Sequence, residues 1–282
     1  MERLVLAAVA LIASAVNGGL GYGFSSITVP VALLFHAGRV LNPGLVLIEL
    51  FINGFALAAN RRAVPAVWPR MRPMLLGAVP GALAGSVLLA WAEPGILKLG
   101  TFAVILPLIL LQSAGLRRPV RNERRASLHA GAALGALYGS TTISGPPLAL
   151  VFNNQGLSRD EFRAALSLFR IVESSCTLLA YLALGLFTRE ALSVSAPLLP
   201  GVAVGLPLGY LAVRRLDGET FRRVCMGTDA LLVGFGLAHS LVARGVVSPA
   251  LAWSGFAAVV LLEAAILAAY FCRARRPLGA AP

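Results

Sequence analysis

The sequence predicts an all-α, polytopic integral membrane protein, built from two inverted-topology repeats and one extra C-terminal span. Three observations support this fold class. The 282 residues are 58% apolar and only 13% charged, whereas soluble domains are about one-quarter charged. Many apolar runs approach the ~20 residues that cross a bilayer as a helix. Finally, two similar stretches rich in glycine and hydroxyl residues interrupt apolar segments at corresponding places in the two halves.

The two interrupted segments organise the rest of the chain. Residues 18–30 (GGLGYGFSSITVP) break the apolar segment 4–35, and residues 135–147 (GALYGSTTISGPP) break the apolar segment 128–152. Both breaks end on a proline and continue with similar sequences, PVALLF and PLALVF. Irregular backbone at membrane depth is tolerated only where protein or a water-filled cavity satisfies its polar groups. Paired interruptions of this kind therefore indicate the binding site of a transporter.

The N-terminal sequence MERLVLAAVALIASA also resembles a signal peptide, with a charged start, a short apolar run and small residues. Cleavage there would remove half of the first interrupted segment, whose counterpart starting at Leu128 is internal and cannot be cleaved. We therefore interpret the N-terminus as the start of the first repeat. The predicted units are a first repeat (1–116), a second repeat (117–242), an extra span (243–272) and a basic tail (273–282).

Seven further apolar runs predict full spans. Two of them carry a second repeat signal, because glycines recur every fourth residue in GAVPGALAG (77–85) and in GVAVGLPLG (201–209). Small residues at this spacing let helix backbones approach closely in lipid, so helix packing is the preferred interpretation. The predicted spans are 43–60, 73–91, 96–116, 162–187, 192–213, 221–242 and 251–272.

The charges of equivalent loops indicate that the repeats are inverted. The turn after the glycine-spaced helix carries Glu93 and Lys98 in the first repeat, but four arginines between 214 and 223 in the second. Opposite charge character places these turns on opposite sides of the membrane. Inversion needs an odd number of crossings per repeat, which holds if each interrupted segment is a re-entrant hairpin. The alternative is a simpler arrangement in which both interrupted segments cross fully.

The re-entrant arrangement also accounts for the basic residues. It places most of the 24 Lys and Arg residues, and the C-terminus, in the cytoplasm of a protein of the cell (plasma or inner) membrane. The net charge of +12 therefore belongs to loops that flank spans, and we expect membrane lipid, not nucleic acid, as the partner. The cytoplasmic basic segments are 61–72, 117–125, 159–163, 214–223 and 273–276.

The sequence carries no catalytic or metal-binding pattern, so we expect neither enzyme activity nor a cofactor. It contains no HExxH, no GxSxG and no phosphate-binding loop. Cys176, Cys225 and Cys272 fall in apolar segments without metal-ligand spacing, and we interpret them as small hydrophobic residues.

The two hairpin tips are predicted to meet near the midplane and to form an anion site. A half-helix begins at each tip, and its free N–H groups and positive dipole end attract anions. Hydroxyl side chains add donors, although they could instead bond to their own helix backbone. The candidate substrate-binding residues are Gly21, Tyr22, Ser25, Ser26, Thr28, Asn53, Gly139, Ser140, Thr141, Thr142, Ser144, Gly145 and Arg170.

Arg170 lies inside the span that follows the second hairpin, and its positive charge predicts that the ligand is negatively charged. A membrane-buried charge costs at least ~2.5 kcal/mol and is a functional-site hypothesis by default. Glu173 stands at i+3 on the same helix face and can pair with Arg170, so a structural ion pair is the alternative. The matching position in the first repeat is Asn53, which predicts anion recognition weighted toward the second tip.

Carboxylates inside the spans are candidates for proton coupling, because carboxylates at such depth can exchange protons. Glu49 lies one turn before Asn53, and Glu173 lies one turn after Arg170. Asp229 is the third candidate and is expected to face the bundle interior. Glu263, in the extra span, is expected to be structural.

The two opposed repeats, the break GLGYG that ends on a proline, and its partner GSTTISGPPLAL (139–150) resemble the TauE/SafE family. The resemblance covers nearly the whole chain, and the second motif is the more specific. It implies a secondary transporter, usually an exporter, of small sulfur oxyanions such as sulfite, sulfoacetate or other organosulfonates. Alternating access between the two tips is the expected mechanism. An anion channel built on the same tips and a structural membrane protein are the alternatives.

Overall fold

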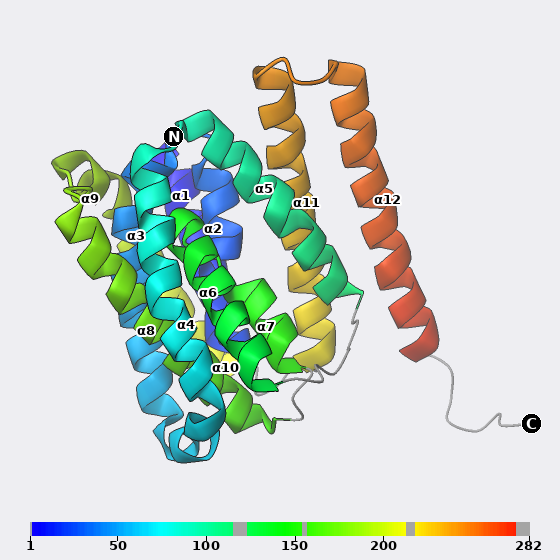
Figure 1. Ribbon diagram of the computed structural model, residues 1–282. Coiled ribbons are helices and arrows are strands. Elements are labelled where there is room, and N and C mark those ends of the chain that lie inside the picture. Colours follow the sequence, from blue (N-terminus) through cyan, green and yellow to red (C-terminus); the bar gives the residue numbers. More distant parts are fainter. Residues whose placement is uncertain (1, 115–122, 154–156, 213–217, 275–282) are drawn as a thin grey trace, which may run out of the picture.

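The computed structural model describes residues 2–114, 123–153, 157–212 and 218–274. In these ranges every regular element is a helix, which confirms the all-α fold class (Figure 1). Most of the predicted basic loop 117–125 and of the tail lies outside the described residues. The helices are α1 (Glu2–Leu20), α2 (Phe24–Ala32), α3 (Gly38–Ala59), α4 (Val64–Trp91), α5 (Pro94–Ser113), α6 (Glu123–Thr141), α7 (Gly145–Asn153), α8 (Arg159–Ala183), α9 (Arg189–Ser195), α10 (Leu198–Ala212), α11 (Gly218–Ala243) and α12 (Pro249–Ala274).

Both predicted interruptions are present as breaks between helices. The first break separates α1 from α2, and there Gly21 and Gly23 have φ angles of 86° and 114°. Glycine adopts positive φ without steric penalty, so the local sequence explains this break. The second break separates α6 from α7 and passes through Thr142, which has a φ of 58° although it is not glycine. That the helix pairs α1–α2 and α6–α7 are re-entrant, each entering and leaving the membrane by the same face, stays a prediction.

Among the described residues, seven helices are long and apolar enough to cross a membrane: α1, α3, α4, α5, α8, α11 and α12. The predicted span at 192–213 is a bent pair of helices. That stretch begins within α9 and continues as α10, and the two helices meet at an angle of 42°. Pro197 lies between them, and proline disfavours helical backbone in the residue before it and removes a backbone donor. The bent pair would be an eighth span.

The predicted basic loop at 61–72 is also wrong for most of its length. Only Arg61–Ala63 form a short 3₁₀ turn, and α4 begins at Val64. Pro65 occupies the first turn of α4, where its missing N–H is not needed. Arg70 and Arg72 are therefore exposed residues on the first turns of a helix that extends beyond its apolar part.

The glycine-spaced helices each pack on the broken helix of the other repeat: α4 lies along α6, and α10 lies along α1 (Figure 1). A Cβ on any of the six aligned glycines would overlap a backbone carbonyl oxygen of the partner helix. The helix-packing interpretation of the glycines is therefore confirmed. The carbonyl oxygens belong to Leu128, Ala132 and Ala136 in α6, and to Ala7, Leu11 and Ala15 in α1.

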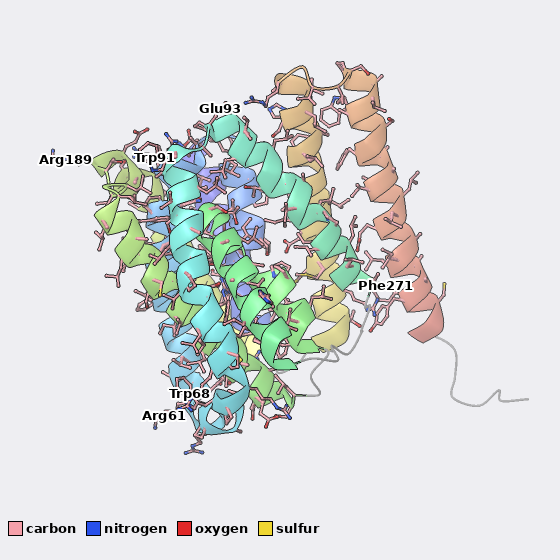
Figure 2. All side chains as sticks on the ribbon, viewed as in Figure 1. Arg61, Trp68, Trp91, Glu93, Arg189 and Phe271 are labelled. Atoms are coloured by element: carbon pink, nitrogen blue, oxygen red, sulfur yellow. The ribbon has the colours of Figure 1, made fainter. Side chains whose placement is uncertain are left out.

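Exposed tryptophans mark the two ends of α4. Figure 2 shows Trp68 beside Arg61 at one end of the bundle, and Trp91 beside Glu93 at the other. Trp68 is 41% exposed and Trp91 is 80% exposed. The 1.5 Å rise per residue separates them by roughly 34 Å, close to the ~30 Å thickness of a bilayer's hydrocarbon core. Tryptophan is enriched at both membrane interfaces, so the spacing agrees with a membrane-spanning α4.

The extra helix α12 stands at the edge of the bundle and packs mainly on α11 (Figure 1). Only 6% of the residues in its most apolar 18-residue stretch are buried inside the protein. Glu263 is its buried carboxylate and accepts a hydrogen bond from Ser113 of α5. The turn that precedes α12 is tied to the α4–α5 turn by a bidentate ion pair, in which two nitrogens of Arg244 each lie 2.8 Å from an oxygen of Glu93.

Candidate functional site

The two breaks pack against each other in the interior. Gly145, the first residue of α7, lies against Tyr22 in the first break. A Cβ on Gly145 would be 3.1 Å from the Cβ of Tyr22 and 3.6 Å from the nitrogen of Gly23. Tyr22 is 1% exposed. Contact between the breaks brings the N-terminal ends of α2 and α7, which belong to different repeats, into one region.

Each half-helix start donates one hydroxyl to a buried glutamate on the long helix that follows it. In the first repeat, Ser25 Oγ donates to Glu49 Oε1 of α3 at 2.5 Å. In the second repeat, Ser144 Oγ donates to Glu173 Oε1 of α8. Both carboxylates are fully buried. The two repeats therefore contribute the same pair of groups, a serine and a glutamate.

Arg170 joins the two repeats. Its Nη2 lies 2.5 Å from Glu49 Oε1, so the ion pair runs from α8 of the second repeat to α3 of the first. The side chain is 1% exposed. The pairing with Glu173 that the sequence allows on the same helix is not the one formed: Arg170 pairs across to Glu49, and Glu173 accepts from Ser144.

Tyr138 of α6 completes the surroundings of the two carboxylates. Its ring is fully buried and lies near both Glu49 and Glu173. Its hydroxyl bonds to Ser174 Oγ at 2.8 Å. We call the set Ser25, Glu49, Tyr138, Ser144, Arg170 and Glu173 the buried polar centre.

The buried polar centre retains unused hydrogen-bonding capacity. Within the described part of the chain, Nε and Nη1 of Arg170 have no hydrogen-bond partner, nor do Oε2 of Glu49 and Oε2 of Glu173. An unpaired buried donor or acceptor costs about 1–3 kcal/mol, and more when it is charged. The two unpartnered nitrogens of the guanidinium can therefore donate hydrogen bonds to an acceptor-rich ligand such as an oxyanion.

Two small pockets lie at opposite ends of α3. The pocket at the C-terminal end of α3 includes Asn60 and Gly21 of the first break, whereas the other includes Gly38, Val29 of α2, and Ser140 and Thr141 at the end of α6. Glu49 lies roughly two helical turns from either pocket along α3. The buried polar centre therefore stands between the two pockets.

Each of the two pockets carries an amide and a basic residue. Asn17, Gly21 and Arg163 line the first pocket, and Asn42, Lys98 and Thr141 line the second. Among the described residues, the side-chain amide of Asn17 and the Oδ1 of Asn42 have no hydrogen-bond partner. Arg163 and Lys98 thus place a positive charge beside each pocket, which favours an approaching anion, whereas the unpartnered Oδ1 of Asn42 is an acceptor and does not.

Several predicted site residues instead follow the alternative interpretation and bond to local backbone. Ser26 donates to the carbonyl of Gly23, and Ser140 and Thr141 donate to carbonyls one turn earlier in α6. Thr142 donates to the carbonyl of Thr141. The Gly139 carbonyl accepts a hydrogen bond from Tyr181 at 2.7 Å. These residues shape the breaks, and their side chains or carbonyls are already engaged.

Three further candidates lie close to the centre or to the breaks. Asn53 approaches Ser174 Oγ at 3.5 Å, which is the outer limit of a hydrogen bond. Thr28 is fully buried, and its hydroxyl has no partner among the described residues. Asp229 on α11 is fully buried near Ser26 of α2, and both of its oxygens lack a partner in the same ranges.

The equivalence of Glu49 and Glu173 is a feature that the sequence interpretation missed. Aligning the prolines of the two breaks places Asn53 on Arg170. The register that aligns Gly77 with Gly201 instead places Glu49 on Glu173. The two glutamates play the same hydrogen-bonding part, as acceptors for Ser25 and Ser144, in agreement with the second register. The glycine spacing was therefore the signal that could have found this carboxylate pair.

The fold and the site define a multi-pass α-helical membrane protein with a buried, charged centre between two polar pockets. A family model described as sulfite exporter TauE/SafE matches residues 6–237. The chain therefore belongs to the sulfite exporter TauE/SafE family, whose members are membrane transporters of sulfite and related sulfur anions. Searches of curated proteins and of solved structures gave no match.

Proposed function

We propose that the protein is a secondary transporter that exports small sulfur oxyanions, such as sulfite, sulfoacetate or other organosulfonates, across the cell membrane. The observation that carries this proposal is the buried guanidinium of Arg170, two nitrogens of which have no partner among the described residues, between pockets at opposite ends of α3. A buried cation of this kind marks a functional site in a membrane protein.

The chemistry of the centre suits an oxyanion. A guanidinium presents its N–H groups as a planar fork that matches two oxygens of a carboxylate, phosphate or sulfonate. Ser25 and Ser144 place hydroxyl donors nearby, at the starts of α2 and α7. The positive dipole ends of these helices add to the preference for negative charge. A sulfonate or sulfite group, with three oxygens, can accept from the arginine, and from Ser25 once that hydroxyl releases Glu49.

The arrangement favours alternating access over an open channel. A continuous pore would need an unobstructed path between the two pockets, but the ion pair Glu49–Arg170 lies between them. The two pockets also lie at opposite ends of α3 and share no lining residue. We propose that the repeats rock on the α1–α10 and α4–α6 contacts, exposing Arg170 first to one pocket and then to the other. The C-terminus is proposed to lie in the cytoplasm.

The test is anion transport by purified protein in proteoliposomes. Arg170→Ala removes the guanidinium, and we expect sulfite and sulfonate affinity to fall by about 10- to 100-fold or more, since charge-assisted hydrogen bonds contribute ~1.5–3 kcal/mol each. Arg170→Lys keeps the charge but loses the fork, and should restore little affinity. Arg189→Ala, at an exposed arginine, is the matched control. Unchanged affinity in Arg170→Ala would remove this residue from the site.

A panel of anions tests the substrate class separately. Sulfite and sulfonates should raise the unfolding temperature of the purified protein in proportion to their binding, whereas simple monocarboxylates of similar size should raise it less. Equal stabilisation by both classes would contradict selectivity for sulfur oxyanions. The absence of any stabilisation would contradict the proposed site itself.

A further inference from the structure

The buried polar centre holds two carboxylates but one arginine. The groups that face Glu49 are Ser25 from α2, Tyr138 from α6, and Arg170 and Glu173 from α8. Arg170 supplies the positive charge among them. With Glu49 ionised on Arg170, the centre is neutral only if Glu173 carries a proton. The resting charge pattern is then one ion pair and one neutral acid, each bonded to a serine.

We propose that each transported anion is accompanied by one proton, which Glu49 takes up when the anion displaces it from Arg170. The inference rests on the proposed function and specifies its coupling. The carboxylate of Glu49 offers the same chemistry to Arg170 as the substrate does, so the two compete for one guanidinium. Glu49 is in this sense a tethered counter-ion that occupies the anion's position when no anion is bound.

Electrostatics makes the exchange of the anion and the carboxylate proton-dependent. Once the anion holds Arg170, an ionised Glu49 would be a buried charge without a counter-ion, and that state is strongly unfavourable in a low-dielectric interior. Protonation removes the charge. Oε2 of Glu49 is available for the proton, because it has no partner among the described residues, whereas Oε1 accepts from both Ser25 and Arg170.

The cycle balances in protons and charge. One proton passes from water on the loading side to Glu49 Oε2 as the anion binds, and the centre stays neutral. On the far side the anion leaves, Glu49 ionises and pairs again with Arg170, and the proton passes to water there. For a monoanion the net transfer is one anion and one proton, so no charge crosses the membrane. Glu173 keeps its proton throughout and remains bonded to Ser144.

The probe for the test is isethionate, a sulfonate that stays a monoanion across the pH range and so cannot carry a titratable proton itself. Wild-type proteoliposomes loaded with a pH dye should move about one proton per isethionate. A potassium diffusion potential should leave the isethionate flux unchanged, while a pH gradient should drive it. Isethionate flux without proton movement, or flux that follows the potential, would overturn the inference while leaving the proposed anion transport intact.

Glu49→Gln separates the proposed roles of the two carboxylates. This variant should bind isethionate about tenfold tighter or more, because the competing carboxylate is gone. Any flux that it retains should carry charge and show no proton movement. Glu173→Gln should keep the one-to-one ratio. Continued proton coupling in Glu49→Gln, or its loss in Glu173→Gln alone, would assign the proton elsewhere.

A binding measurement keeps the test valid if Glu49→Gln does not turn over. Calorimetry of isethionate binding in buffers of different ionisation enthalpy counts protons directly. We expect about one proton taken up per anion in the wild type and none in Glu49→Gln. Equal proton uptake in both proteins would overturn the inference. Failure of the wild type to bind or transport any sulfonate would instead contradict the proposed function.

Discussion

The two repeats carry the same serine–glutamate pair but only one of them carries an arginine. Ser25 donates to Glu49 and Ser144 donates to Glu173, so the two pairs are alike in their hydrogen bonds, although the serines stand at different distances from their glutamates in sequence. Arg170 lies on α8, and the glycine register places it opposite an apolar residue, Val46, on α3. The comparison teaches that the two predicted repeats share an acidic position, and that a single basic residue makes these two positions inequivalent. Glu49 is an ion-pair partner, whereas Glu173 is a hydrogen-bond acceptor.

The largest expected change in the free energy of unfolding comes from replacing Glu49 or Glu173 by alanine. Glu49→Ala leaves Arg170 as a buried cation without its partner, which should lower the free energy of unfolding by about 3–5 kcal/mol. Glu173→Ala removes the acceptor of one hydroxyl and should cost about 1–3 kcal/mol. Denaturation of the purified variants in detergent measures both. A saturating sulfonate should restore much of the stability of Glu49→Ala and little of that of Glu173→Ala. Equal losses in the two variants would mean that the glutamates are equivalent after all.

The reciprocal helix contacts allow a second comparison, in which the repeats should behave alike. Gly81 on α4 and Gly205 on α10 each meet a backbone carbonyl of the partner helix. An added methyl group at either position forces the helices apart, so Gly81→Ala and Gly205→Ala should each cost about 1–3 kcal/mol. Gly255→Ala on α12 is the control, because its Cβ would meet nothing within 4 Å. It should be neutral or stabilising by ~0.5–1 kcal/mol, as measured by thermal unfolding. A tolerated Gly81→Ala beside a damaging Gly205→Ala would show that the two interfaces differ.

The breaks themselves differ in how they achieve positive φ. Gly23→Ala should destabilise the protein by roughly 1–2 kcal/mol from backbone strain alone, and its Cβ would also lie 2.9 Å from Val16 Cγ1. Thr142→Gly should be neutral or slightly stabilising, because glycine relieves the strain at that φ angle. Thermal unfolding of the two single variants measures this. A destabilising Thr142→Gly would show that the hydroxyl of Thr142, and not its backbone, is what the second break requires.

The sequence was sufficient to predict the breaks but not the contacts between them. Glycine density and an added proline are local signals, and they located both interruptions correctly. The pairing of Arg170 with Glu49 joins residues 121 positions apart, and it depends on which faces of α3 and α8 meet. Glu173 was the nearer acid in sequence, yet Arg170 pairs with Glu49 on α3. Nearness in sequence was therefore the wrong criterion for this pair.

Helix phase also separated hydroxyls that face the buried polar centre from hydroxyls that bond to local backbone. Ser25 and Ser26 are neighbours in sequence, but Ser25 bonds to Glu49 while Ser26 bonds to the carbonyl of Gly23. The two serines cannot be distinguished by composition, but the helix turns by about 100° per residue and places them on different faces of α2. The extension of α4 into its basic segment was missed for a related reason. Arginine signals the end of the apolar region, not the end of the helix.

The smallest expected effect concerns a second arginine–glutamate pair, which differs from the buried one in its exposure to solvent. Arg244 binds both oxygens of Glu93 at 2.8 Å on the surface. The hydrogen bond from Arg244 lowers the pKa of the Glu93 carboxyl below its ordinary value. A lowered pKa in the folded state means that the pair stabilises the protein fully above the carboxyl's ordinary pKa, and that this contribution is lost as the pH falls through the lowered value.

Glu93→Gln should therefore lower the unfolding temperature slightly at neutral pH, and the difference from the wild type should vanish in acid. High salt should shrink the same difference, because exposed charges are screened. The stability of the buried pair Glu49–Arg170 should respond far less to salt, since its side chains are 1% exposed or less. Thermal unfolding across pH and ionic strength compares the two pairs. If the stability of the Glu49–Arg170 pair did depend on salt, water would reach the buried polar centre in the resting state. Nε and Nη1 of Arg170 would then bind water before an anion arrives.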